Sequence, residues 1–259
     1  MEMESYEHGV PSWIDHSSPD PAKASEFYRA LFGWDIMEGG PEYGGYNLAT
    51  KGGRNVAGIG PQMGGPGPSY WATYVNVDSA DDVMEKVRAH GGTVIVEPMD
   101  VMDQGRMAVF ADPAGALIGI WQPGSMKGAG LVNEHGTLGW NELVTSDVEG
   151  SLAFYGAVFG WGHASHEGGP PGGYTEWKVG GRTMGGMMAK PPGMPAEVPS
   201  YWGVYFVVSD VDATVARATE LGGSVFLPAF DSPQGRLAGI VDPFGAMFSV
   251  IDPTGVPQQ

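Results

Sequence analysis

The sequence predicts an α+β protein made of two tandem modules, and an internal repeat is the main evidence. The segment WIDHSSPDPAKASEFYRALFGW at 13–34 recurs as WNELVTSDVEGSLAFYGAVFGW at 140–161. A second segment at 104–120, QGRMAVFADPAGALIGI, recurs as QGRLAGIVDPFGAMFSV at 234–250. Repetition across a whole domain indicates that one folding unit was duplicated.

The spacing of the repeat also sets the expected domain boundaries. We predict a first module at 9–124, a linker at 125–135 and a second module at 136–254. The linker is rich in glycine and lacks a hydrophobic period, as expected of a connecting segment. A chain of 259 residues with 42% hydrophobic content can form a proper core in each module.

Composition narrows the expected class of protein. The net charge of -17 disfavours nucleic acid and anionic membranes as partners. The absence of cysteine excludes disulfides and thiol nucleophiles and fits a cytoplasmic location. No apolar run is long enough for a membrane span. We therefore expect a soluble monomer or homodimer whose partner is a small molecule.

Each half should begin with a strand followed by a helix. Asp20 and Asp147 are suited to cap the two helices, and Gly33 and Gly160 to end them. Glycine-punctuated strands follow, and a second strand–helix–strand series then begins near Trp71. This order predicts two βαβββ motifs in each module, which together form one curved mixed sheet.

Two Asp-Pro-x-Gly segments, at 112–115 and 242–245, fit type I turns that close hairpins. Counting outward from the first turn places residues 111, 108 and 106 opposite 116, 119 and 121. Residues opposed across a hairpin share one face of the sheet. The count therefore predicts that Arg106, Ala108 and Phe110 share a face with Leu117, Gly119 and Trp121.

These motifs resemble the vicinal oxygen chelate superfamily, which includes glyoxalase I, bleomycin resistance proteins and extradiol dioxygenases. The resemblance rests on the opening strands, the Asp-x6-Phe-Tyr helices, the Gly-Gly helix ends and the Asp-Pro-x-Gly hairpins, and it covers nearly all of the chain twice. The paired Phe-Gly-Trp helix ends and Gln-Gly-Arg hairpins are similar to a tandem two-module, glyoxalase-like subfamily described as hydroxylases. The resemblance implies two modules of this fold.

The resemblance also implies where metal ligands would stand. Metal-dependent relatives carry a His before the first helix, a further ligand on the fifth strand and a Glu after the Asp-Pro-x-Gly turn. Side chains that cannot ligate a metal well occupy these positions: Trp13, Ala72 and Gly119 in the first module, and Trp140, Gly203 and Ser249 in the second. We therefore predict no metal site and no cofactor.

The concave face of each sheet, here called its cup, should contain these positions and the residues two away along the same strands. Mid-strand small residues and surrounding aromatics favour a cavity for a flat, largely apolar ligand, such as an aromatic or polyketide-like compound. The predicted ligand-binding residues are Trp13, Tyr74, Asn76, Phe110 and Trp121 in the first cup and Trp140, Tyr205 and Ser249 in the second.

Four charged residues are the candidates for catalysis. Asp15 and Glu142 should face into the cups, where burial would raise the carboxyl pKa and suit a general base. Arg106 and Arg236 could stabilise an oxyanion. The alternatives are structural: the carboxylates and arginines could form ion pairs, and Trp13 and Trp140 could fill the cups as core.

Three functions remain open at this point. The chain could bind an aromatic metabolite without reaction, or it could be a cofactor-poor isomerase, lyase or hydroxylase-like enzyme of secondary metabolism. It could also be a metal-dependent glyoxalase-type lyase, dioxygenase or hydroxylase, although the replaced ligands argue against this. Metal analysis of purified protein separates the third from the others.

Overall fold

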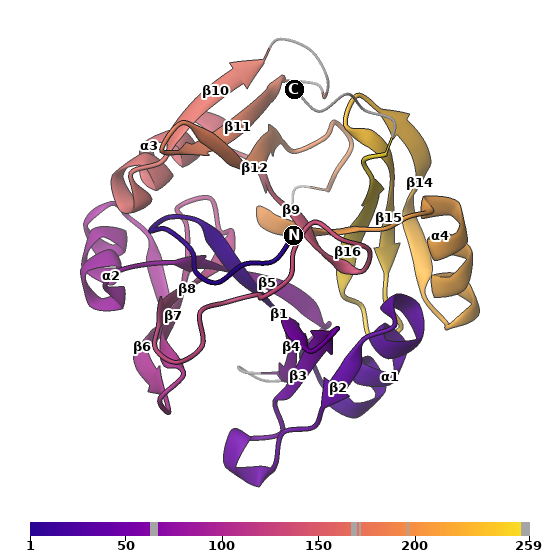
Figure 1. Ribbon diagram of the computed structural model, residues 1–259. Coiled ribbons are helices and arrows are strands. Elements are labelled where there is room, and N and C mark those ends of the chain that lie inside the picture. Colours follow the sequence, from indigo (N-terminus) through magenta and orange to yellow (C-terminus); the bar gives the residue numbers. More distant parts are fainter. Residues whose placement is uncertain (63–66, 167–169, 171, 196, 255–259) are drawn as a thin grey trace.

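A computed structural model describes residues 1–62, 67–166, 170, 172–195 and 197–254. It contains two sheets of eight strands, one from each half of the repeat. Figure 1 shows them as two similar bodies with their helices on the outside and the N-terminus near the centre of the view. In the part of the chain that the structure describes, no helix is long and apolar enough to cross a membrane.

The first sheet has the strand order β2-β3-β4-β1-β5-β8-β7-β6. Its elements are β1 (Pro11–Ser18), α1 (Pro21–Phe32), β2 (Asp35–Met37), η1 (Pro41–Tyr43), β3 (Asn47–Lys51), β4 (Arg54–Pro61), β5 (Tyr70–Asn76), α2 (Ala80–Ala89), β6 (Thr93–Val101), β7 (Gly105–Ala111) and β8 (Leu117–Pro123).

The second sheet repeats this order as β10-β11-β12-β9-β13-β16-β15-β14. Its elements are β9 (Thr137–Thr145), α3 (Val148–Phe159), β10 (Gly162–His166), β11 (Tyr174–Val179), β12 (Arg182–Ala189), β13 (Tyr201–Val207), α4 (Val211–Glu220), β14 (Ser224–Ser232), β15 (Gly235–Val241) and β16 (Met247–Asp252). The predicted fold class is confirmed, because each sheet joins two βαβββ motifs.

Local sequence explains how each half begins. The Asp20 carboxylate caps α1 by accepting from the Lys23 amide, and Gly33 ends the helix at a left-handed φ of 70°. In α3 the Asp147 carboxylate accepts from the Gly150 amide, and Gly160 ends the helix at a φ of 73°. The helices therefore begin and end as the sequence predicts.

The two modules share their hydrophobic cores. Helix α1 of the first module contacts α4 of the second, and α2 contacts α3 (Figure 1). Phe32 of α1 packs against Phe206 of β13 with ring centroids 4.8 Å apart. Phe110 of β7 packs against Phe154 of α3 at 5.9 Å. Each module therefore covers part of its partner's apolar surface, and the interface is continuous with both cores.

Buried hydrogen bonds cross the same interface in symmetric pairs. The Tyr28 hydroxyl donates to Asp242 over 2.9 Å, and the Tyr155 hydroxyl donates to Asp112 over 3.0 Å. The Trp34 indole donates to the Gly136 carbonyl, and the Trp161 indole donates to the Gly9 carbonyl, each over 2.7 Å. Both Asp-Pro-x-Gly turns are thus held by a tyrosine from the other module.

The hairpin register differs by one residue from the register that the sequence count predicts. Ala111 pairs with Leu117 and Val109 with Gly119, because the connection spans 112–116 and Asp112 bonds to Ala116. A slip of one residue moves alternate side chains to the opposite face. Arg106, Ala108 and Phe110 therefore lie on the helix-covered face and not in the first cup, so this prediction was wrong.

Candidate functional site

The floor of the first cup is a cluster around Asp15. The Asp15 carboxylate accepts from the Trp13 indole over 2.8 Å and from the Tyr46 hydroxyl, which also accepts from the Trp13 indole at 3.0 Å. Trp13 and Asp15 come from β1, while Tyr46 directly precedes β3. The cluster therefore ties two strands together around one carboxylate.

The floor of the second cup repeats the arrangement around Glu142. Its two carboxylate oxygens accept from the hydroxyls of Tyr174 (2.8 Å) and Tyr205 (2.7 Å). The Trp140 indole donates to the Tyr174 hydroxyl over 3.0 Å. Glu142 is 8% exposed, so a nearly buried carboxylate is held by two phenols.

Burial sets the protonation of both clusters. It raises the pKa of the Asp15 carboxyl, and hydrogen bonds from Tyr46 and Trp13 oppose that rise. Burial likewise raises the pKa of the Glu142 carboxyl, against the hydrogen bonds from Tyr205 and Tyr174. Burial, and then the neighbouring carboxylates, raise the pKa of the tyrosines, so their hydroxyls keep their protons and donate.

Aromatic rings fill the small positions of the first cup. A side chain at Gly58 would collide with the Tyr46 hydroxyl, and one at Gly119 would collide with the Tyr74 ring. Trp13 is 3% exposed and Tyr74 is 7% exposed. The floor of this cup is therefore closed by its own side chains.

In the second cup a side chain at Gly186 would likewise collide with the Tyr174 hydroxyl, but the aromatic residues of this cup are more exposed than those of the first. Trp140 and Tyr205 are half-buried, and a Cβ at Gly203 would meet no atom nearer than 3.6 Å. The wall above the floor is apolar: the Phe226 ring lies over Gly239 and is 40% exposed. An apolar wall above a small polar floor is the usual form of a small-molecule site.

The arginines lie apart from both carboxylates. Arg106 forms a two-point ion pair with Asp81 of α2 (3.0 Å) and also donates to Asp100. Arg236 binds Asp212 and Asp231 in the same way. The predicted inward orientation of both arginines was wrong, because the register shift places them beside the first turns of α2 and α4.

Two other predicted residues have structural contacts. The Asn76 amide donates to the Tyr6 carbonyl over 2.9 Å and so fixes the N-terminal segment. The Trp121 indole donates to the Met126 carbonyl over 3.0 Å, and the ring is 6% exposed. Ser249 lies in the second cup, where its hydroxyl hydrogen-bonds to Tyr205.

Sequence reasoning missed Tyr46 and Tyr174. Both follow a Gly-Gly pair, as Gly-Gly-Tyr at 44–46 and at 172–174. This short repeat within the duplicated modules was the available signal. It was hidden because the intervening loops differ in sequence.

The residues of the cups do not fit a divalent metal. Among the described residues no three His, Cys, Asp or Glu side chains come together as a ligand group. Each floor has one carboxylate, and the groups aimed at it are hydroxyl and indole hydrogens, which satisfy the lone pairs that a metal would need.

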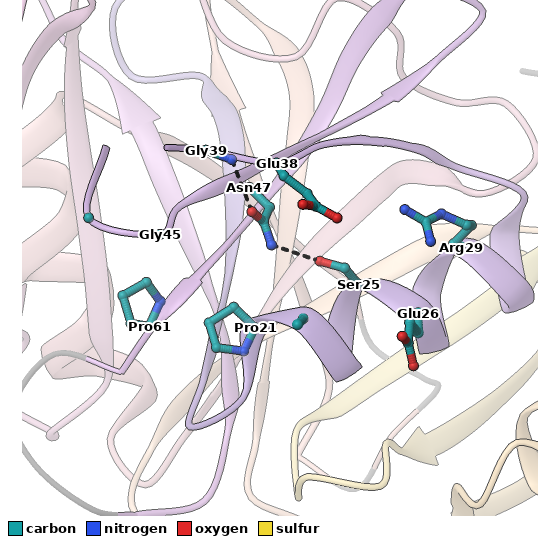
Figure 2. Close-up of a pocket in the computed structure, with 11 residues that line it drawn as sticks. Pro21, Ser25, Glu26, Arg29, Glu38, Gly39, Gly45, Asn47 and Pro61 are labelled. Atoms are coloured by element: carbon teal, nitrogen blue, oxygen red, sulfur yellow. Dashed lines mark hydrogen bonds between the residues drawn. The ribbon is translucent and has the colours of Figure 1, made fainter. Parts of the chain in front are cut away.

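Two cavities lie outside the cup floors. One of about 420 Å³ lies between α1 and the loop before β3, where Asn47 donates to Ser25 and accepts from the Gly39 amide (Figure 2). The side-chain amide of Asn47 is therefore engaged in holding the loop before β3. The other, of about 580 Å³, lies at the junction of the modules and has Trp140 in its wall.

Residues 12–120 and 137–250 each match the family model described as Glyoxalase/Bleomycin resistance protein/Dioxygenase superfamily. "Putative glyoxylase CFP32" of Mycobacterium tuberculosis is 44% identical over 260 residues, covering 98% of both chains. Anthracycline biosynthesis protein DnrV of Streptomyces peucetius is 40% identical over 267 residues, covering 96% of this chain and 95% of that protein.

Solved structures show the same fold at low identity. The Mn(II)-bound glyoxalase from Novosphingobium aromaticivorans matches with a TM-score of 0.63 at 14% identity, covering 98% of this chain and 87% of that chain. The 2,3-dioxygenase LapB from Pseudomonas sp. KL28 matches with a TM-score of 0.65 at 13% identity, covering 95% and 93%.

Proposed function

Since this chain belongs to the Glyoxalase/Bleomycin resistance protein/Dioxygenase superfamily, we propose that it is a metal-independent member that binds a flat, largely apolar aromatic molecule in the second cup. The observation that carries the proposal is the Glu142 cluster: a buried carboxylate held by two phenols beneath a half-exposed aromatic wall. The first cup has the same chemistry, but its Trp13 and Tyr74 are buried.

The relatives support the class of ligand. DnrV and its counterpart DauV of a Streptomyces strain, 40% and 39% identical, are named for anthracycline biosynthesis. Anthracyclines have a flat polycyclic skeleton that carries phenols and carbonyls. Such a skeleton suits Tyr201, Phe226 and Met247, which lie on the cup face of the second sheet.

The Glu142 cluster can also perform acid–base chemistry. With its pKa raised by burial, the carboxylate can take a proton from a phenol or an activated carbon, and the Tyr205 hydroxyl can donate to the oxyanion that forms. Asp15, which is half-buried, has the same potential in the first cup.

Binding of 1,8-dihydroxyanthraquinone, followed by calorimetry in buffer with excess chelator, tests the proposal. We expect binding without metal, and a loss of about 1 kcal/mol of binding free energy in Phe226→Ala, the scale of one aromatic contact. Ile95→Ala is the matched control, because Ile95 stands at the corresponding position of the first module. We expect that variant to bind like the parent.

Elemental analysis of the purified protein completes the test. We expect no stoichiometric divalent metal. One tightly held metal per chain, with binding or turnover abolished by chelator, would overturn the proposal in favour of a metal-dependent lyase, dioxygenase or hydroxylase. Turnover that persists in chelator and disappears in Glu142→Gln would show that the carboxylate is catalytic.

A further inference from the structure

The 580 Å³ cavity, here called the junction pocket, lies where the N-terminal segment crosses the second module. Its floor is buried and its walls are half-exposed. Floor residues are Pro11, Val132, Leu138 and Asn141, and wall residues are Met3, Tyr6, Val10, Trp140, Val179 and Met184. The volume falls within the range of about 300–1,000 Å³ that holds small-molecule ligands.

Comparison with the first module shows what a molecule in this pocket would meet. There, the linker enters the gap between β1 and β4: the Ala129 amide donates to the Ser12 carbonyl, and the Gly130 amide donates to the Asn55 carbonyl, each over 2.8 Å. The space is full, because a Cβ at Gly128 would lie 2.6 Å from the Ser12 carbonyl oxygen.

The repeat maps these two acceptors onto residues of the junction pocket. By the internal repeat Ser12 corresponds to Gly139 and Asn55 to Thr183, and both Gly139 and Thr183 line the pocket. The strands diverge here as they do in the first module, since the parallel pairing of β9 with β12 begins only at Glu142. Among the described residues, the second module thus has at this place a pocket where the first has chain.

Trp140 and Asn141 give the pocket its chemical character. Half-buried Trp140 offers an aromatic surface for stacking. The Asn141 Oδ1 accepts from the Thr73 hydroxyl over 2.6 Å, so the donors that Asn141 keeps for a ligand are those of its amide nitrogen. The corresponding residue of the first module is Ile14, which is fully buried.

We propose that the junction pocket is a second binding site, for a flat aromatic compound that carries both carbonyl and hydroxyl groups. The ring stacks on Trp140, a carbonyl accepts from the Asn141 amide, and hydroxyls donate toward the backbone at Gly139 and Thr183. The class of ligand rests on the proposed function, whereas the position rests on the pocket itself. Trp140 borders both sites, because its indole also donates to the Tyr174 hydroxyl in the second cup.

Variants that fill or spare the pocket test the proposal, with 1,8-dihydroxyanthraquinone as the probe. Met184→Trp adds bulk to the pocket wall, and we expect it to weaken binding at least about tenfold, a difference that calorimetry resolves easily. Arg182→Gln and Arg54→Gln are a matched pair: Arg182 lies on the pocket rim, paired with Glu7, and Arg54 pairs with Glu2 beside the filled gap. Only Arg182→Gln should change the affinity.

Hydrogen exchange on the unchanged protein provides a readout that needs no variant. We expect the probe to protect amides at 138–141 and 179–184. Protection at these segments together with a loss of affinity in Met184→Trp supports the site. A weaker affinity in Phe226→Ala does not count against it, because Trp140 borders both the second cup and the junction pocket.

Three results would overturn the proposal, and they are distinguishable. If the probe binds, Phe226→Ala weakens it and Met184→Trp does not, the ligand lies only in the second cup and the proposed function stands. If the probe does not bind at all, both proposals fail. If a synthetic peptide with the linker sequence 125–131 binds and displaces the probe, the pocket is a peptide groove.

Discussion

The two Asp-Pro-x-Gly turns bury an aspartate at the same place in each half of the molecule, yet only one of these aspartates has a histidine as a partner. Asp242 binds His16 over 2.7 Å in addition to Tyr28, and both side chains of this pair are fully buried. Asp112 binds Tyr155, but the residue that corresponds to His16 is Leu143.

The two aspartates therefore have pKa shifts of opposite sign. Burial raises the pKa of Asp112, and hydrogen bonds from Ala116 and Tyr155 do not offset it. Burial would do the same to Asp242, but the hydrogen bond and charge of His16 outweigh it and hold the pKa of Asp242 below its usual value. One turn is thus held by a buried histidine–aspartate pair, and the other by hydrogen bonds from Tyr155 and the backbone.

Separating the modules should have the largest effect on stability, because it breaks the tyrosine–aspartate hydrogen bonds of both halves at once. Fragments 1–124 and 136–254 would each expose aromatic rings that the other covers, such as Phe32 and Phe154. We expect neither fragment to unfold cooperatively by calorimetry, and mixing or coexpression to restore the transition. Independently folded fragments would show that the shared core is dispensable.

Breaking the buried histidine–aspartate pair on one side should have the next largest effect. His16→Leu copies the second half onto the first, and we expect a loss of about 3 kcal/mol in the free energy of unfolding at pH 7, the lower end for removing one partner of a buried pair. The Nδ1 of His16 has no partner among the described residues, which limits the loss. Leu143→Val is the control for packing, and urea unfolding measures both. An equal loss in the two variants would mean that charge contributes nothing.

The two aspartates should respond to pH in opposite directions. The lowered pKa of Asp242 adds stability above the unfolded value of about 3.9, and this is lost as pH falls through the folded pKa. The raised pKa of Asp112 adds stability only at low pH, and this is lost as pH rises from about 3.9 through the folded pKa.

Paired variants isolate these two contributions. The difference in unfolding free energy between the parent and Asp242→Asn should grow from pH 3 to pH 6, and that for Asp112→Asn should shrink, each by about 1.4 kcal/mol per unit of pKa shift. Urea unfolding over this range measures both. Differences that move in the same direction would contradict the opposite pKa shifts of Asp242 and Asp112.

The smallest effects should separate the two cup floors. Gly119→Ala places a methyl group against the Tyr74 ring, and we expect it to cost about 1–3 kcal/mol through strain. A methyl group at Gly203 would make only ordinary van der Waals contacts, at 3.6 Å or more, on a strand backbone, so we expect Gly203→Ala to change stability by no more than about 0.5 kcal/mol. Thermal melting compares the pair. Equal losses would show that the Tyr74 ring moves aside for the added methyl group.

The fold was predictable from sequence because its signals repeat: caps, glycine stops and turns occur at matching places in both modules. The face of the sheet on which Arg106 and Phe110 lie was not predictable. It depends on whether the turn is one residue longer or shorter, and the sequence of the turn fits both lengths. The carboxylates Asp15 and Glu142 were placed correctly in the cups, since they lie on strands whose alternation is regular.

The partners of those carboxylates could not be read in the same way. Tyr46 and Tyr174 precede their strands, so strand alternation gives them no direction. The difference between the two halves at the junction pocket was also not predictable from sequence, because it depends on which segments cover each sheet. Among the described residues the linker fills one gap and the junction pocket lies at the other, and no property of the strands themselves distinguishes the two.

The exchange of tyrosines across the interface bears on how such a chain can evolve. In a dimer of identical single modules, any substitution at the position of His16 would appear on both sides and alter both buried aspartates together. Joining the copies in one chain removes that constraint, so each half can vary its charge while the other keeps the assembly intact. A histidine on one side and a leucine on the other is a state that only a fused pair can reach.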